Sequence, residues 1–171
     1  MLSVFDGLRD VTTLSVFVRL ACALICGGII GIERSYKRRP AGFRTHILIC
    51  IGAAITTLTS QYLYLNMHYF TDMARLGAQV VAGIGFIGAG TIIVTKRQRV
   101  KGLTTAAGLW TSAIIGLTFG GGFYEGGILA TVFIMLAELV FSRIEYRVLE
   151  NVPEINLYME YEGKHCLDDV L

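Results

Sequence analysis

Long apolar stretches separated by short charged segments divide this chain into five predicted helices. Each stretch is close to the ~20 residues that a helix needs to cross ~30 Å of hydrocarbon. Strands are a poor alternative, because backbone in lipid must be hydrogen-bonded within its own segment or in a closed barrel, and the alternation typical of barrel strands is absent. We therefore predict an all-α polytopic membrane protein with spans at Leu14–Ile32, Ile47–Leu63, Leu76–Thr95, Gly102–Gly120 and Gly126–Ser142.

The distribution of Lys and Arg gives these spans an orientation. Only 16% of the residues are charged and the net charge is +2, so the position of each charge matters more than the total. The first and third connections are basic, whereas the second and fourth are not. Since basic loops stay in the cytoplasm, we expect the N-terminus outside and the C-terminus inside. Residues 1–13 lack the features of a cleaved signal peptide, and we expect them to be retained as an interfacial segment.

A short internal repeat links the first and third spans. The run RLACALICG at Arg19–Gly27 aligns with RLGAQVVAG at Arg75–Gly83, and a basic loop follows each span. The simplest interpretation is two hairpins of the same orientation, a parallel repeat, with the fifth helix added. Parallel repeats occur in transporters around a site at the repeat interface, and they also arise by duplication without such a site.

Glycine is concentrated in the first and third spans and predicts close helix packing. The third span contains the string GIGFIGAG, which looks like the glycine pattern of a dinucleotide-binding turn. That interpretation requires the strand, turn and helix of a soluble unit, whereas the flanks here are transmembrane. Small residues four apart instead let helices approach closely. The predicted packing glycines are Gly27, Gly28, Gly31, Gly83, Gly85, Gly88 and Gly90.

Ionisable groups are costly in a membrane, so the polar residues within or beside the spans are the candidate functional residues. Glu33 and Arg44 lie where the first two spans meet their basic loop, and we expect them either to pair across the hairpin or to face water. Glu138 is predicted either to reach the interface or to bond a neighbouring helix. Trp110 lies mid-span, where packing with one indole hydrogen bond is expected. The other candidates toward the cytoplasmic side are Arg34, Thr45, Thr104 and Thr105.

A second group of polar residues is predicted at the outer side. Asp72 and Arg75 are three residues apart, so a local ion pair is one interpretation. The other is an outward-facing cluster in which Arg19 joins them, with Gln79 one turn further in. Asp72 and Glu125 are also weak candidates as oxygen ligands of a hydrated cation, which the nearby arginines oppose electrostatically.

The cysteines give no sign of a metal site. Cys22 and Cys26 share one helix face and Cys50 stands alone in the second span, so apolar packing is expected. The sequence shows no nucleophile-and-base pairing, phosphate loop or nucleic-acid motif, and the basic loops suit anionic lipid headgroups. We therefore predict no cofactor, no enzymatic activity, the lipid bilayer as a partner and no nucleic acid.

Four ordered blocks of the sequence resemble one known family. They are GGIIGIER (Gly27–Arg34), GFRTHILICIGA (Gly42–Ala53), RLGAQVVAGIGFIGAGTI (Arg75–Ile92) and KGLTTAAGLWTSAIIG (Lys101–Gly116). Together they are similar to the MgtC/SapB family of bacterial inner-membrane proteins. The resemblance implies a role in growth at low magnesium and in the survival of pathogens inside macrophages, but not a straightforward magnesium pump. It also implies binding and restraint of the rotary ATP synthase, as described for some members.

The resemblance extends to the C-terminal residues. Some family members carry a cytoplasmic domain resembling the ACT fold, and residues 150–171 fit its beginning. Ile155–Tyr161 alternates well enough for a strand, and Gly163 can turn the chain. About twenty residues cannot bury a core of their own. We therefore expect either a truncated domain, which we favour, or a naturally short tail that docks on something else, following a transmembrane domain at 14–149.

Two functions compete, and a third, membrane enzyme, lacks any motif. The first is a regulatory protein whose helices bind another membrane complex, which rests on the resemblance. The second is a transporter or channel for magnesium, another cation or a small solute, supported by the repeat and the intramembrane polar groups. A cavity lined by Asp72, Arg75, Gln79 and Glu138 would favour transport. A compact core with an exposed groove of small residues would favour partner binding, and such a groove also suits a homodimer.

Overall fold

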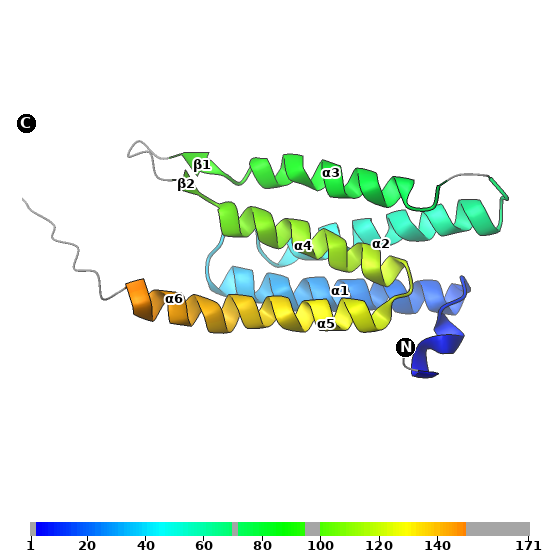
Figure 1. The fold of residues 1–171 in the computed structure, drawn as a ribbon, viewed down its shortest axis with the longest axis horizontal. Helices are drawn as coiled ribbons and strands as arrows, with labels where there is room; N and C mark the ends of the chain where they lie inside the picture. Colours follow the sequence, from blue (N-terminus) through cyan, green and yellow to red (C-terminus); the bar gives the residue numbers. More distant parts are fainter. Residues whose placement is uncertain (1–2, 70–71, 95–99, 150–171) are drawn as a thin grey trace, which may run out of the picture. The chain divides into compact units, whose positions relative to one another are not determined.

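A computed structural model describes residues 3–69, 72–94 and 100–149, and helices account for most of this part of the chain (Figure 1). A 3-10 helix, η1 (Ser3–Leu8), comes first. Each predicted apolar stretch then forms a helix, and most helix ends lie within a few residues of the predicted ones. These helices are α1 (Thr13–Tyr36), α2 (Phe43–Leu65), α3 (Arg75–Ala89), α4 (Leu103–Gly120) and α5 (Tyr124–Leu136).

The third predicted span differs most from the structure. Among the described residues, four helical segments are long and apolar enough to cross a membrane, namely α1, α2, α4 and the run Tyr124–Ile144 that contains α5. The prediction through Thr95 was too long, because α3 has 15 residues and ends at Ala89. The strands β1 (Ile93–Val94) and β2 (Val100–Lys101) pair antiparallel, so the all-α prediction missed a small ribbon. Ile92, Ile93 and Val94 are β-branched, which favours extended backbone over helix.

Local sequence explains where helices begin and turn. At the start of α1 the Thr12 N–H donates to Ser15 Oγ at 2.9 Å, and the Ser15 N–H donates to Thr12 Oγ1 at 3.2 Å. This reciprocal cap satisfies two donors that the first helical turn leaves unpaired. Gly102 precedes α4 with a φ of +96°, and Gly122 joins α4 to α5 with a φ of +77°. Glycine adopts this left-handed region without steric cost.

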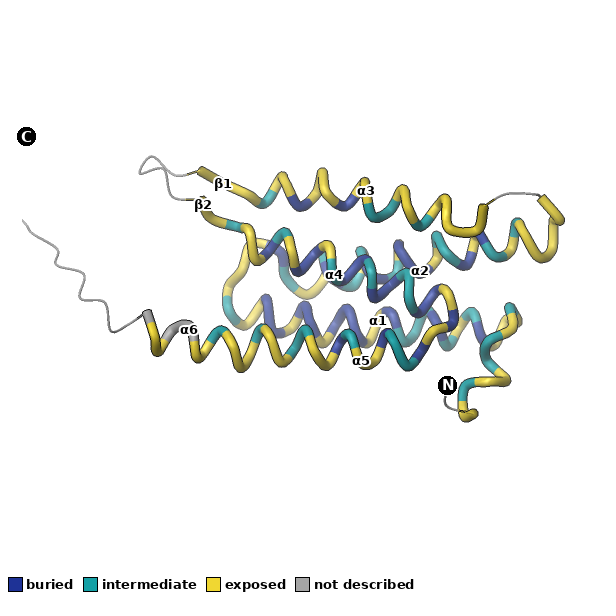
Figure 2. The backbone as a smooth tube through the Cα atoms, in the orientation of Figure 1, coloured by how far each residue is buried: buried dark blue, intermediate teal, exposed yellow. Residues whose placement is uncertain are grey.

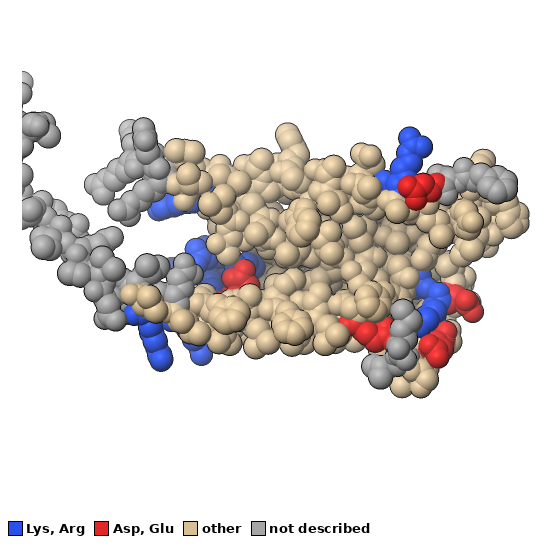
Figure 3. Space-filling view, viewed as in Figure 1, with Lys and Arg blue, Asp and Glu red and all other residues tan. Residues whose placement is uncertain are grey.

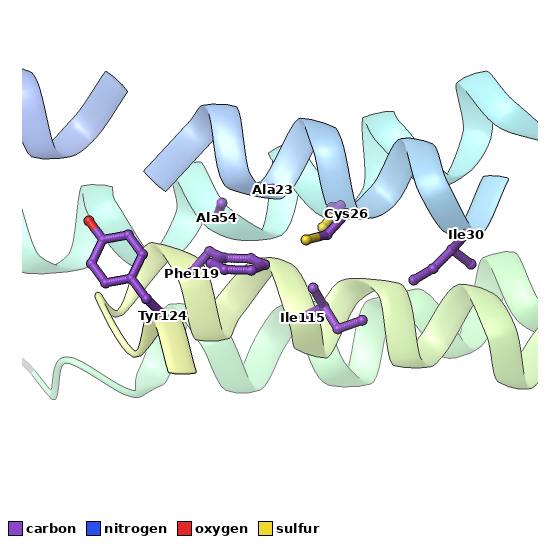
Figure 4. Packing of buried hydrophobic residues seen from close by; sticks show 8 residues of the cluster. Ala23, Cys26, Ile30, Ala54, Ile115, Phe119 and Tyr124 are labelled. Carbon is purple, nitrogen blue, oxygen red and sulfur yellow. The ribbon is translucent and has the colours of Figure 1, made fainter. Parts of the chain in front are cut away.

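The core lies between α1, α2 and α4, and α5 packs on α4 and α1. The alanines Ala23 and Ala54 are fully buried there, and Phe119 of α4 lies beside Tyr124, as Figure 4 shows. α3 packs on α4 and α2, where Ile84 contacts a smaller cluster with Ala53. Only Ile84 and Gly88 of α3 are buried, and Figure 2 shows most of this helix exposed.

Glycines allow α1 and α4 to approach α2 closely. A Cβ at Gly27 would lie 2.9 Å from the Cβ of Cys50, and one at Gly31 would lie 2.7 Å from the Cα of Phe43. In α4, a Cβ at Gly116 would collide with the carbonyl oxygen of Cys50. Backbone contact therefore replaces side-chain filling between these helices, as is common in membrane proteins.

Residues Ala137–Leu171 form a second compact unit. Its described part consists of a π-helical turn, η2 (Ala137–Phe141), and the helix α6 (Ser142–Leu149). The Ser142 hydroxyl donates to the main-chain carbonyl oxygen of Glu138 at 2.5 Å. The predicted start of an ACT-like domain at residues 150–171 lies outside the described residues.

Candidate functional site

A buried arginine organises one end of the bundle formed by residues 3–136. Arg19 projects from the second turn of α1 and is fully buried. Its Nη1 donates to Gln61 Oε1 at 2.7 Å and to the Gly120 carbonyl oxygen at 2.9 Å. Its Nη2 donates to the carbonyl oxygens of Arg9 at 2.6 Å and Leu8 at 3.3 Å. The guanidinium thus bridges η1, α2 and the C-terminal end of α4, where the helix dipole favours positive charge.

A second arginine ties η1 to the turn between α4 and α5. Arg9 Nη2 pairs with Glu125 Oε1 at 2.6 Å, and Arg9 Nη1 donates to the Gly122 carbonyl oxygen at 3.2 Å. Desolvation lowers the pKa of Arg9, but hydrogen bonds to Asp6 and Glu125 outweigh it, so the pKa lies above its ordinary value. The Tyr124 hydroxyl donates to the Leu8 carbonyl oxygen at 3.1 Å. We call Arg9, Arg19, Gln61, Tyr124 and Glu125 the Arg19 cluster.

The opposite end of α1 carries a second buried ionic group. Glu33 Oε2 lies 2.6 Å from Arg34 Nε, and Glu33 Oε1 lies 2.7 Å from Lys37 Nζ. Both Glu33 and Arg34 are buried. We call Glu33, Arg34 and Lys37 the Glu33 cluster. The carboxylate bonds both cations, so the group keeps a net charge of +1, and the partly exposed Lys37 links it to the surface.

His46 lies buried near the Glu33 cluster, at the start of α2. A Cβ at Gly31 of α1 would lie 3.2 Å from the His46 Cβ, and the His46 Nδ1 lies 2.9 Å from the Gly42 carbonyl oxygen. A carbonyl oxygen only accepts, so we assign the Nδ1–H tautomer or the charged imidazole. The buried Thr105 of α4 lies on the same helix face as Gly108, whose Cβ position is 3.7 Å from His46 Nε2.

The interior between these two ends is apolar. From Arg19 to Glu33, the buried positions of α1 hold alanine, cysteine, glycine and isoleucine. The buried hydroxyls of Ser112 and Thr131 donate to main-chain carbonyl oxygens of their own helices. Figure 3 likewise shows the charged side chains of this unit toward the two ends of the helices, on the face drawn. Within the described ranges 3–69, 72–94 and 100–136, no buried Asp, Glu, Lys or Arg lies between the two clusters, and the buried His46 lies on the inner side of the Glu33 cluster.

The predicted outward-facing cluster does not form. Asp72, Arg75 and Gln79 are exposed, and Arg19 binds Gln61 and carbonyl oxygens instead. The prediction failed because α3 packs on α4 and α2, whereas Arg19 belongs to α1. Asp72 Oδ1 accepts from the Ala74 N–H at 2.9 Å. Glu125 is held by Arg9, and the described residues contain no group of three or more His, Cys, Asp or Glu placed to hold a metal ion.

The other predicted site residues are also dispersed. Glu33 pairs with Arg34 and with Lys37, the residue that follows the last one of α1, and Arg44 is exposed, because these two cations lie closer to Glu33 along the chain. Trp110 is 45% exposed on α4. Glu138 is half-buried in the π-helical turn of the second unit. Of the predicted threonines, Thr105 is buried, Thr45 is half-buried and Thr104 is exposed.

Arg9 and Gln61 were missed by the sequence analysis. Arg9 lies in the N-terminal segment, which the sequence predicted only to be interfacial. Gln61 lies 42 residues from Arg19. Gln61 could have been recognised because it carries the one side-chain amide in the predicted span Ile47–Leu63, which has no charged residue. Neither residue lies in a recognisable motif.

The predicted packing glycines fall into two groups. Gly27, Gly28 and Gly31 face α2, and Gly88 of α3 faces Ala106 of α4 at 3.4 Å. In contrast, a Cβ at Gly83 or Gly85 would have no neighbour within 4 Å, and Gly90 meets only its own helix end. Exposed positions around the two open glycines form a surface that we call the α3 face. It consists of Ala78, Gln79, Ala82, Gly83, Gly85 and Phe86.

Comparison with known proteins places this bundle in a family. Residues 20–147, well over half of the chain, match the MgtC family. The chain belongs to the MgtC family. It is 42% identical over 149 residues to YhiD of Escherichia coli K12, whose name proposes magnesium transport, and this alignment covers 85% of the chain and 69% of YhiD.

Two further relatives support membership of the MgtC family. Protein MgtC of Salmonella typhimurium LT2 is 37% identical over 131 residues, covering 77% of the chain and 54% of MgtC. A Haemophilus influenzae protein is 40% identical over 129 residues, covering 72% of the chain and 54% of that protein. No solved structure matches the chain. Family membership and the apolar helices together identify a membrane protein.

Proposed function

We propose that this MgtC-family protein is a regulatory membrane protein that binds another membrane protein through the α3 face. The observation that carries the proposal is the open space around Gly83 and Gly85, beside a Phe86 side chain that is 87% exposed. Glycine within a helix costs about 1 kcal/mol relative to alanine. These two glycines gain no compensating contact among the described residues, so an approaching helix from outside accounts for them best.

The apolar interior supports binding over transport. Transporters place polar groups or broken helices near the bilayer midplane, where the substrate is held. Here the buried charged side chains among the described residues of 3–136 belong to the Arg19 and Glu33 clusters, His46 lies beside the second, and mainly apolar side chains fill the space between. Magnesium or other cation transport is the second candidate, favoured by the name of YhiD and by the internal repeat.

The partner and the setting follow from the family resemblance. We propose that the partner is a membrane complex such as the rotary ATP synthase, restrained by this protein during growth at low magnesium or survival within a host. The location would be the bacterial inner membrane, with the N-terminus outside and the C-terminus in the cytoplasm, as the basic loops predict. A second copy of the chain is the alternative occupant of the α3 face.

Ion flux separates the two candidate functions. The purified chain is reconstituted in sealed vesicles that contain a magnesium-sensitive or potential-sensitive dye. We expect no flux above that of protein-free vesicles, because the packed interior offers no polar path. The Glu33→Gln variant tests the buried carboxylate, and the Asp72→Asn variant is the matched control at an exposed carboxylate. Magnesium entry that Glu33→Gln abolishes would overturn the binding proposal in favour of transport.

A further inference from the structure

The ribbon between α3 and α4 carries exposed apolar side chains on both faces. Ile93 is 61% exposed, Val94 66% and Val100 50%. Directly opposed residues share a face of a ribbon. Val94 therefore shares a face with Val100, and Ile92 lies on that face too because it is two residues before Val94. Ile93 shares the other face with Lys101. One face is wholly apolar, and the other mixes apolar and basic side chains.

Because α3 is too short to cross the hydrocarbon by itself, the ribbon that follows it lies where the crossing must be completed. Fifteen residues at 1.5 Å each make a helix of about 22 Å, roughly 8 Å less than the hydrocarbon thickness. The chain continues through Thr91 and Ile92, whose N–H groups donate to Gly88 and Ala89 carbonyl oxygens at 2.9 and 3.0 Å. The two residues of β1 add about 7 Å at ~3.3 Å each. Together with residues 90–92, helix and ribbon are therefore long enough to reach the boundary between hydrocarbon and headgroups.

Backbone pairing limits how deep the ribbon can lie. β1 and β2 pair with each other, and Gly102 allows the close approach, since a Cβ there would collide with the Thr91 carbonyl. The outer edges of a two-stranded ribbon remain unpaired, which the hydrocarbon centre does not tolerate. In water, so short a ribbon with exposed apolar faces is marginal. The boundary between acyl chains and headgroups satisfies both requirements, because headgroups and water reach the edges there.

We propose that the β1–β2 ribbon is a lipid-binding element at the boundary between hydrocarbon and headgroups. Ile92, Val94 and Val100 insert among the acyl chains from one face of the ribbon. Lys101 pairs with Ile93, one residue nearer the helices, so its long side chain extends from the other face toward the phosphates, where its charge suits anionic lipid. The ribbon thereby completes the crossing that α3 alone is too short to make. This restores five crossings to a chain in which four helical segments reach the required length. The inference is independent of the proposed partner.

Tryptophan fluorescence tests the placement of the ribbon. Trp110, the single tryptophan, is replaced by phenylalanine, and a new tryptophan is introduced as Val94→Trp or, in a second variant, Val100→Trp. A matched control, Arg39→Trp, lies exposed in the loop between α1 and α2. Each full-length variant is reconstituted in phosphatidylcholine–phosphatidylglycerol vesicles, with or without bromine near the carbonyl end of the acyl chains.

The ribbon reporters and the loop control should give opposite results. We expect bromolipid to quench tryptophan at positions 94 and 100 strongly, and aqueous iodide to quench it weakly. The control should be quenched by iodide more than by bromolipid. Strong iodide quenching at both ribbon positions would place the ribbon in water and overturn the proposal. Protection from both quenchers would mean that protein covers the ribbon, which overturns the proposal equally.

Discussion

Gly116→Ala is expected to destabilise the helix bundle by about 2 kcal/mol. The new Cβ would strike the Cys50 carbonyl oxygen and lie 2.8 Å from the Ala53 Cβ, so α2 and α4 must separate. Overpacking a dense core typically costs ~1–3 kcal/mol, and the backbone position of the clash places this variant in the upper part of that range. The helix propensity of alanine returns up to ~1 kcal/mol. The measurement is the midpoint of unfolding of the purified protein in mixed micelles.

Gly83→Ala is the matched control for this prediction. The residue change and the helical setting are the same, but nothing lies within 4 Å of the new Cβ. We expect a gain of up to ~1 kcal/mol, since alanine restricts the unfolded chain more than glycine does. Gly120→Ala repeats the test in the core, because its Cβ would collide with the Ala54 carbonyl oxygen. Equal destabilisation at positions 83 and 116 would contradict the packing of α2 against α4.

Arg19→Met is expected to cost about 3 kcal/mol or more. Methionine preserves much of the apolar stem but leaves Gln61 Oε1 and the carbonyl oxygens of Leu8, Arg9 and Gly120 without their donor. Each buried acceptor left unsatisfied costs ~1–3 kcal/mol, and partial entry of water reduces the sum. The unfolding midpoint reports the loss. Amide hydrogen exchange in residues 3–12 should also accelerate, because Arg19 holds η1 against the bundle.

Two variants make the Arg19 prediction specific. Arg19→Lys keeps the charge but cannot reach four acceptors in a fixed fork, so an intermediate loss is expected. Arg75→Met removes an exposed arginine from the start of α3, and surface changes of this kind are usually within ~0.5 kcal/mol. If Arg19→Met cost no more than Arg75→Met, the buried network would not stabilise this end of the bundle.

The helices were predictable because their signals are local. Apolar stretches bounded by charges gave all five, and Thr12 with Ser15 caps the first. The early end of α3 gave no hydropathy signal, since Ile92, Ile93 and Val94 continue the apolar stretch. Their β-branching was the relevant signal, and it is weaker than hydropathy over so few residues.

The contacts between helices were far less predictable. Arg19 was identified as a candidate, but its partners are mainly carbonyl oxygens, which every residue has and which therefore leave no mark in a sequence. Glycines posed the same difficulty. Gly27 and Gly83 hold matching places in the internal repeat, yet a Cβ at one would clash with α2 and a Cβ at the other would meet open space. Which helix face is covered depends on the whole packing arrangement.

This difference between repeat halves shows how the fold would serve the binding proposed above. The first hairpin uses its glycines to build the core, whereas α3 leaves Gly83 and Gly85 on the outside. A partner helix could therefore approach the α3 face as closely as α1 approaches α2 within the chain. Gln79 on the same face offers a side-chain amide for a hydrogen bond between helices.

Photocrosslinking in native membranes tests the α3 face most directly. A p-benzoylphenylalanine probe replaces Phe86, and in a control chain it replaces Phe133, which is 67% exposed on α5. We expect the probe at Phe86 to give one discrete adduct with another membrane protein, identified by mass spectrometry, and Gly83→Leu to abolish it by blocking close approach. The probe at Phe133 should not give this adduct. Adducts with lipid or a second copy alone at Phe86, or the same adduct from both positions, would contradict the proposed binding function.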